Sequence, residues 1–146
     1  MINVFQVELT TEQRVQVNAS GWDGVEWGKT YLDLTNAMFE DSDNVSVMEM
    51  IVEAIEFGIV KHTMTLDTDD FDTAFALGNG VYGSHGGEDS VTEHCKHKSA
   101  SVGDIFIRNH TDGVVVAGFG FEELSNAEIK EIETLVPQAM GMVQDV

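Results

Sequence analysis

The chain has 146 residues, of which 42% are hydrophobic, and its 26 acidic against 7 basic residues give a formal net charge of -19. A chain of this length can bury one hydrophobic core, so we expect a single acidic domain over residues 1–146. The charge excludes direct binding to nucleic acid, because an acidic surface repels the phosphate backbone.

Membrane insertion and secretion are not expected from the sequence either. No apolar run approaches the ~20 residues that a membrane span needs, and the first residues lack the basic and apolar regions of a signal peptide. Cys95 is the only cysteine. We therefore expect a cytoplasmic protein without an internal disulfide.

The first 45 residues predict a strand followed by two helical segments. Apolar and polar residues alternate over about residues 2–9, which is the period of a strand. Thr10 and Gln13 have the spacing of a capping box, so a short helix begins there, and Gly21 ends it. Residues 22–45 predict a loop that leads into a helix. The sequence leaves the role of this region, from residue 18 onward, open.

The middle of the chain predicts a helix, a strand and a second helix. Ser46 and Glu49 form another capping box, and the apolar stripe after them predicts a helix over residues 46–57. Alternation of apolar and polar residues predicts a strand over residues 59–66. The segment DTDDFDTAFALG, residues 67–78, predicts a helix whose acidic N-terminal end is stabilised by the helix dipole.

The last third of the chain predicts a hairpin and a final helix. The Asp-Gly dipeptide at residues 112–113 is a strong turn signal between two runs of β-branched and aromatic residues. We therefore expect paired strands at about residues 104–109 and 114–119. Ser125 opens a helix that we expect Pro137 to stop.

This order of elements predicts an α+β fold. We expect a mainly antiparallel sheet of about four strands, with the helices packed on one face. The residues that we expect to be buried are Ile51, Ile55, Val60, Met64, Ile105, Ile107 and Val115.

Histidines around the single cysteine are the candidates for a metal site. Zinc accepts such ligands, and the candidates are His85, His94, Cys95 and His97. Two histidines three residues apart in a strand point to opposite faces, so we expect exposed histidines beside a half-buried thiol and no stoichiometric zinc. A nucleophilic cysteine with a histidine base is the other interpretation, but no orienting acid or oxyanion donor can be placed beside it. We therefore assign no catalytic residue and no cofactor.

Three further patterns favour structural roles. The segment GVEWGKT ends like a phosphate-binding loop but has Asp23 where that loop needs glycine, so we interpret it as a surface turn. The acidic segment at residues 67–78 has Asp72 where a calcium-binding loop needs glycine. Trp22 and Trp27 lie among glycines, and we expect them to fill the edge of the core.

Three segments in the region 66–124 follow one another in a recognisable order. DDFDTAFALGN begins a helix with acidic and aromatic residues, SASVGDIF contains a Ser-x-Ser-Val-Gly-Asp block, and DGVVVAGFGFEEL contains a Gly-Phe pair. In this order they resemble the YodL-like proteins and related small proteins of phages and mobile elements. The resemblance implies an origin of that kind and brings no established activity with it.

The same block has a structural interpretation that needs no relative. Gly103 and Asp104 form a tight turn before a strand, and Ser99 or Ser101 bonds to the backbone in that turn. Phe119 or Phe121 is expected to close the core. The block is then a scaffold hairpin.

Two classes of function remain open. The first is a non-enzymatic accessory protein that acts through protein contacts; in its sharper form the acidic surface mimics DNA and occupies a basic nucleic-acid-binding protein. Two rows of carboxylates spaced like phosphates would favour mimicry, and an even scatter would favour a role in solubility alone. The alternative is a small enzyme or a ligand- or metal-binding domain that uses the Gly- and His-rich loop 78–97. We expect a protein partner and no membrane, and a homo-oligomer is compatible with the sequence.

Overall fold

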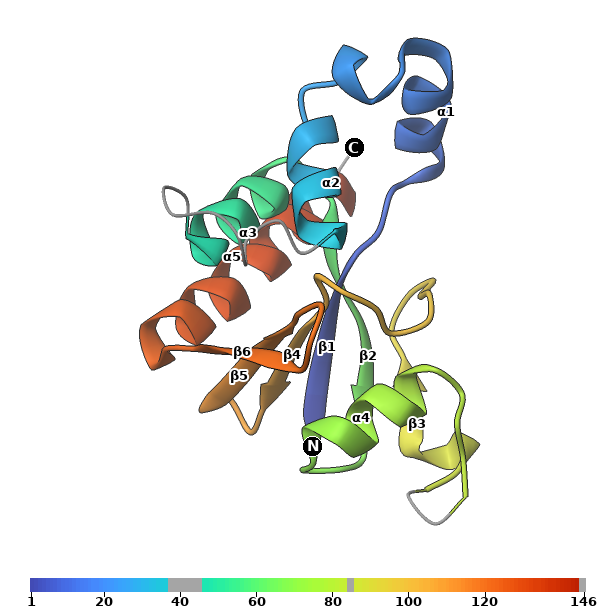
Figure 1. Ribbon diagram of the computed structural model, residues 1–146, viewed down its shortest axis with the longest axis vertical. Helices are drawn as coiled ribbons and strands as arrows, with labels where there is room; N and C mark the ends of the chain where they lie inside the picture. The colour runs from blue at the N-terminus through green and yellow to red at the C-terminus, as the bar shows by residue number, and fades with distance from the viewer. Residues whose placement is uncertain (37–45, 84–85, 145–146) are drawn as a thin grey trace.

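The computed structural model describes residues 1–36, 46–83 and 86–144 and shows an α+β protein built on one antiparallel sheet (Figure 1). Within these ranges the sheet has six strands in the order β3-β2-β1-β4-β5-β6, and each neighbouring pair is antiparallel. The predicted α+β class is confirmed. The expected sheet of about four strands is too small, because the two edge strands, β3 and β6, were not predicted. The strands are β1 (Ile2–Val7), β2 (Val60–Leu66), β3 (Val91–Glu93), β4 (Ile105–Arg108), β5 (Asp112–Val116) and β6 (Phe121–Leu124).

Local caps start four of the described helices, and at α5 Ser125 and Glu128 form the predicted capping box. Thr10 forms the predicted capping box with Gln13, the Ser46 hydroxyl accepts from the backbone N–H of Glu49, and the Asp70 carboxylate caps the fourth helix. No helix within the described ranges is long and apolar enough to cross a lipid bilayer. The helices are α1 (Thr11–Ser20), α2 (Gly28–Thr35), α3 (Val47–Glu56), α4 (Phe71–Gly78) and α5 (Asn126–Gln144), with 3-10 helices at Trp22–Gly24 and Glu88–Ser90.

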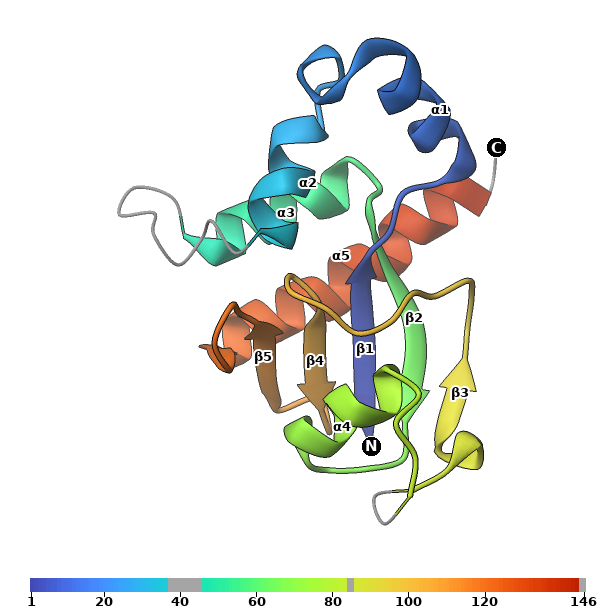
Figure 2. The same cartoon turned by 45° about the vertical axis from the view of Figure 1, so that its right-hand side comes forward.

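Helices pack on both faces of the sheet (Figure 2). One core lies between the sheet and α2, α3 and α5, and a second core lies between the other face and α4. The expectation of helices on one face is wrong because both faces of β1 are apolar. Ile2 and Val4 belong to the core under α4, and Phe5 and Val7 belong to the other core. The seven residues predicted to be buried are all 2% exposed or less.

The β4–β5 hairpin turns at Asn109 and His110 rather than at the predicted Asp-Gly dipeptide. Both residues have a left-handed backbone, with φ of 51° and 63°. Residues 112–113 already belong to β5. Gly113 is needed there for packing, because a Cβ would lie 2.9 Å from Cγ1 of Ile129 in α5. The predicted turn position is therefore wrong, because packing against α5 rather than a turn accounts for the glycine at residue 113.

Pro137 lies inside α5 and does not stop it. Proline removes one hydrogen bond from a helix interior. The helix continues because its other face is anchored in the core, where Ile132 and Val136 are fully buried, whereas Pro137 is exposed. Packing of an apolar face stabilises a helix more than local propensity does.

The two phenylalanines of the segment Gly118-Phe119-Gly120-Phe121 lie in different environments. Phe121 closes the core under α4, with its ring 6.0 Å from that of Phe71 and 6.2 Å from that of Phe106. Phe119 lies in the tight turn between β5 and β6 and is 97% exposed. The expectation that Phe119 or Phe121 closes the core is confirmed by Phe121.

Candidate functional site

The candidate metal ligands follow β3 and point in different directions. His94 and His97 both lie beyond the end of the strand. His94 Nε2 is 2.7 Å from the hydroxyl of Thr65, whereas His97 Nε2 is 2.8 Å from a carboxylate oxygen of Glu93. The two rings therefore diverge, as expected from their spacing, although the strand that was to hold them ends earlier.

No three His, Cys, Asp or Glu side chains in the described ranges are placed to share a metal ion. His85 lies outside those ranges. The expectation of no stoichiometric zinc stays a prediction, and elemental analysis that finds about one zinc per chain would contradict it.

Both ring nitrogens of His97 face protein groups rather than an open site. Its two ring nitrogens both face acceptors, the Glu93 carboxylate at 2.8 Å and the carbonyl oxygen of Lys98 at 3.3 Å. Both contacts are hydrogen bonds only when each nitrogen carries a proton. The hydrogen bond to Glu93 raises the pKa of His97, and the Lys98 carbonyl adds to this. In this arrangement the ring has no free lone pair for a metal or a substrate proton.

The geometry at Cys95 does not support a nucleophile. The thiol is half-buried and donates to the carbonyl oxygen of His62 over 3.5 Å. Burial raises the pKa of Cys95, so the thiol stays protonated at neutral pH. The ring of His62 lies between those of Phe5 and His94, and its burial together with the nearby His94 lowers its pKa.

A cleft of about 560 Å³ lies between the C-terminal end of α4 and the segment at residues 97–99. Part of the predicted loop 78–97 lines it. Met64 and Leu77 are buried apolar residues of the lining, and Tyr82, at its rim, is 47% exposed. This volume is in the range of small-molecule sites.

Charged and polar groups also line the cleft. The ion pair of Glu93 and His97 is in its wall, together with Lys98 and Ser99. Glu88, from the second 3-10 helix, is exposed and completes the charged lining.

Lys98, which lines the cleft, and two further lysines form no ion pair with a described residue. The ion pairs of the described residues engage Arg14, Lys29 and Arg108. Lys61, Lys96 and Lys98 have no carboxylate within 4 Å in the same part of the chain. The strand register pairs Lys61 with Gln6, whose side chain contacts the backbone of Lys98. Lys98 acts at longer range on the buried carboxyl group of Asp104, whose pKa it lowers.

A buried polar network holds the wall of the cleft to the sheet. The Gln6 amide donates to the carbonyl oxygen of Lys98 and to the carboxylate of Asp104, each over 3.0 Å. Its oxygen accepts from the backbone N–H of Lys98 at 3.2 Å and from the hydroxyl of Thr63 at 2.9 Å. Thr63 is the extra residue of a bulge in β2, since Val4 pairs with Met64 and the next residue pairs with His62.

Asp104 is the charged member of this network and is fully buried. One carboxylate oxygen accepts from Gln6 and from the backbone N–H of Ser101, and the other has no partner among the described residues. Burial raises the pKa of Asp104 to about 6, although both hydrogen bonds oppose the rise. The tight turn thus uses a carboxylate where the sequence suggested a serine hydroxyl.

Gly103 gives the turn before β4 its shape. Its φ is 91°, and a Cβ would lie 2.7 Å from the carbonyl oxygen of Leu34 in α2. The Gly-Asp pair is therefore structural, in agreement with the scaffold interpretation.

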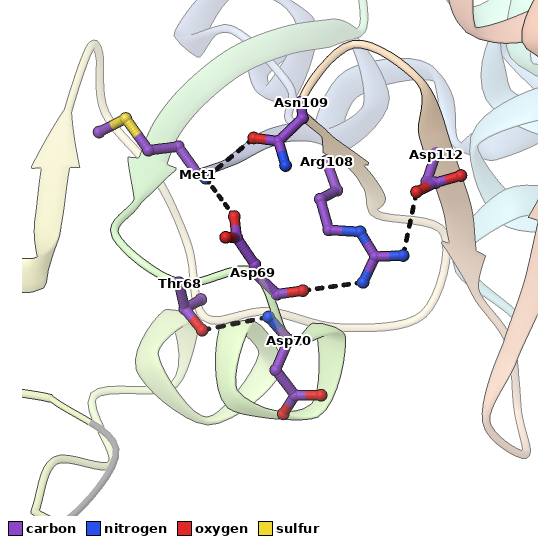
Figure 3. A network of polar contacts seen from close by, with 7 residues as sticks. All are labelled: Met1, Thr68, Asp69, Asp70, Arg108, Asn109 and Asp112. Carbon is purple, nitrogen blue, oxygen red and sulfur yellow. Dashed lines mark hydrogen bonds and ion pairs between the residues drawn. The ribbon is translucent and has the colours of Figure 1, made fainter.

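A second polar cluster gathers where β1 begins (Figure 3). The N-terminal ammonium group donates to the Asp69 carboxylate at 2.5 Å and to the side-chain oxygen of Asn109 at 3.2 Å. Arg108 donates to the Asp69 carbonyl oxygen at 2.8 Å and to the Asp112 carboxylate at 3.1 Å. The cluster ties the β2–α4 connection to the β4–β5 hairpin, which is a structural role.

An acidic groove of about 490 Å³ runs between α3 and α5. Glu49, Glu53 and Glu56 come from one face of α3, and Glu131 comes from α5. None of the four forms an ion pair with another described residue. The apolar part of its lining is Met48 and the half-buried Val52. We call this feature the α3–α5 groove.

The tryptophans and the GKT segment have structural places. Trp27 is 7% exposed, and Trp22 stacks on Tyr31 with ring centroids 5.0 Å apart. The segment Gly28-Lys29-Thr30 forms the first turn of α2, and a Cβ on Gly28 would meet the carbonyl oxygen of Trp22. Trp27 is a core residue and Trp22 packs against the core, in agreement with the prediction that they fill its edge, whereas GKT is part of a helix rather than a surface turn.

Comparison of the chain with protein-family models, curated proteins and solved structures finds no match. The resemblance of residues 66–124 to YodL-like proteins therefore stays a prediction.

Proposed function

We propose that the protein is a non-enzymatic accessory protein of phage or mobile-element type, and that it binds a basic segment of a partner protein in the α3–α5 groove. One observation carries this proposal: four glutamates that form no ion pair within 4 Å with a described residue surround a groove with apolar residues in its lining. The phage-type origin rests on the resemblance alone.

The chemistry of the groove favours an amphipathic basic helix as its occupant. An apolar helix face would contact Met48 and Val52, and lysines or arginines at its edges would meet the glutamates. Complementary charge accelerates association and selects the partner, while burial of the apolar face holds the complex together.

The distribution of the other carboxylates bears on the idea of DNA mimicry. Exposed acids also occur outside the groove, on α1, on both 3-10 helices and on β6, which favours solubility as one role of the acidity. In the mimic form of the proposal the partner is a basic nucleic-acid-binding protein. Double-stranded DNA should then displace that partner from this protein, because both occupy the same basic surface.

Two variants of equal charge test the groove. Glu49→Gln, Glu53→Gln and Glu131→Gln together remove three charges from it, and a control removes three exposed charges elsewhere, at residues 12, 26 and 123. The probe is a fluorescent synthetic peptide of lysine and leucine with helical amphipathic spacing, followed by anisotropy in about 0.15 M salt, where exposed charges act over only ~8 Å.

We expect the groove variant to lose about tenfold in affinity for the peptide and the control to lose less than about twofold. A scrambled peptide of the same composition should bind more weakly than the amphipathic one, because it presents no continuous apolar face. Equal losses in the two variants, or no binding of the amphipathic peptide, would contradict the proposal.

A further inference from the structure

We propose that residues 97–101 form a pH-sensitive strap, which is closed while the buried carboxyl group of Asp104 is protonated and opens when that group loses its proton. The strap belongs to the connection between β3 and β4, which crosses β2 and β1 (Figure 2). Residues 97–99 form one wall of the cleft beside α4. The strap lies outside the α3–α5 groove, so the inference is independent of the proposed protein contact.

A few hydrogen bonds hold the strap to the rest of the protein. None of its residues belongs to a helix or a strand. The Gln6 side chain accepts from the backbone N–H of Lys98 and donates to its carbonyl oxygen. The backbone N–H of Ala100 donates to a carbonyl oxygen at the end of α4 over 3.2 Å, and that of Ser101 donates to the Asp104 carboxylate over 2.9 Å. A segment held in this way opens at a lower free energy than the central strands do.

The hydrogen bonds of Asp104 show where its proton lies. Oδ2 accepts from Gln6 and from the Ser101 backbone, as a carbonyl oxygen does. The proton therefore belongs to Oδ1, which has no partner in the part of the chain that the structure describes. Loss of this proton leaves an unpaired charge in a fully buried place, which is strongly unfavourable. Because Ser101 contacts the carboxylate directly, movement of the strap admits water to it.

Two charged groups act on Asp104, and their effects are opposite. Lys98, in the strap, favours the ionised form, whereas Glu8, just beyond β1, favours the protonated form. The elements around them contribute uncharged groups. These are the Gln6 amide from β1, a hydroxyl group from β2, the backbone N–H of Val116 from β5, and backbone carbonyl groups of α2 and α4 that face the adjoining turn and the strap. Burial outweighs the groups that favour ionisation and raises the pKa of Asp104 to about 6.

The pH range of opening follows from the pKa of Asp104 in the two states. In the open state water surrounds the carboxyl group, so its pKa returns to the ordinary value of 3.8, against about 6 in the closed state. The closed strap thus holds the proton more tightly. The open state is least populated below about pH 4, gains as pH rises, and levels off above about 6. The two values give a roughly 20-fold increase in the open-to-closed ratio between roughly pH 4.5 and 7.5.

Hydrogen exchange followed by NMR tests this opening in the native protein and in Asp104→Asn. The readout is the protection of the backbone amides of Lys98, Ala100 and Ser101, corrected for the intrinsic effect of pH on exchange. We expect protection in the native protein to fall roughly 20-fold from pH 4.5 to 7.5. In Asp104→Asn it should change less than about twofold, because asparagine has no proton to lose. His97 keeps its ion pair in both proteins, so its own titration cancels in the comparison.

Urea separates opening of the strap from unfolding of the whole chain. About 1 M urea accelerates exchange through global unfolding, which exposes much surface, and has little effect on a small local opening. The strap amides should therefore respond less to urea than the amides of β1 and β4. An equal response would mean that the strap opens only when the protein unfolds, and the proposal would be overturned.

A pair of lysine variants tests the electrostatic part of the mechanism. Lys98→Met removes the cation that favours the ionised form, so the loss of protection should extend to higher pH than in the native protein. Lys96→Met, just outside the strap, should leave the pH dependence unchanged. Constant protection in the native protein, the same pH dependence in Asp104→Asn, or equal effects of the two lysine variants would contradict the proposal.

Discussion

Replacing Asp104 by asparagine should remove a pH dependence of stability that this one buried carboxyl group creates. Its pKa is raised to about 6 from an ordinary value of 3.8, because the ionised group is buried with one oxygen unpartnered in the described part of the chain. The folded protein holds the Asp104 proton more tightly than the unfolded chain does. Stability from this group is therefore complete below about pH 4 and is lost as pH rises through about 6.

The size of the effect follows from the two pKa values. Their difference corresponds to about 3 kcal/mol of unfolding free energy between low and neutral pH. About 2 kcal/mol of it falls between roughly pH 4.5 and 7.5, a range above the sequence pI of about 4.2 where the protein keeps a negative charge.

Asparagine reproduces the protonated state at every pH. Its oxygen can accept the hydrogen bonds from Gln6 and the Ser101 backbone, and its amide nitrogen takes the place of the protonated oxygen. The stability of Asp104→Asn relative to the native protein should therefore increase by about 2 kcal/mol from pH 4.5 to 7.5.

Urea unfolding followed by tryptophan fluorescence measures this difference, since Trp22 and Trp27 pack in or against the core. Other acids titrate in both proteins and cancel in the comparison. The control is Asp89→Asn on an exposed 3-10 helix, which makes the same chemical change at the surface. If the Asp104 difference is constant with pH, the carboxyl group is not the buried, proton-holding group described above.

Three further predictions concern packing and charge. Gly113→Ala should lower the unfolding free energy by about 1 to 3 kcal/mol in the same urea assay, because the new methyl group would press on Ile129; an unchanged value would mean that α5 shifts freely. Pro137→Ala should raise it by about 1 to 3 kcal/mol, since alanine restores a hydrogen bond inside α5, and a decrease would show that the proline is needed there. The melting temperature should be higher in about 0.15 M than in 0.01 M sodium chloride, with a smaller gain when Glu123 and Glu131 become glutamine; a flat or falling value would mean that the acids are already compensated.

The elements that could be predicted from the sequence are those with local signals. A capping residue followed by an apolar stripe defines a helix start within one turn, and this predicted α1, α3 and α5 at Thr10, Ser46 and Ser125. Alternation predicted the central strands β1 and β2 for a similar reason. The edge strands β3 and β6 have three and four residues and no apolar alternation, so only their pairing with a neighbour identifies them.

The errors at Gly113 and Pro137 share one cause. Each residue normally marks a turn or the end of a helix, and here contacts distant in the chain determine its place. The network of Gln6 and Asp104 was missed because the two residues are 98 positions apart. A glutamine within an apolar strand is the one signal that could have indicated it, since a buried amide needs polar partners.

The position of β1 in the centre of the sheet has a consequence for the synthesis of the chain. β1 pairs with β2 and with β4, so it has no complete set of neighbours until residue 108 has left the ribosome. Until then Ile2, Val4 and Phe5 are without a core, and an unpaired apolar strand associates readily with others of its kind. Every unfinished chain that has emerged that far also has a large excess of carboxylates, and their mutual repulsion keeps neighbouring nascent chains apart. The charge that surrounds the folded domain therefore acts already on the incomplete chain, where it opposes association between neighbours.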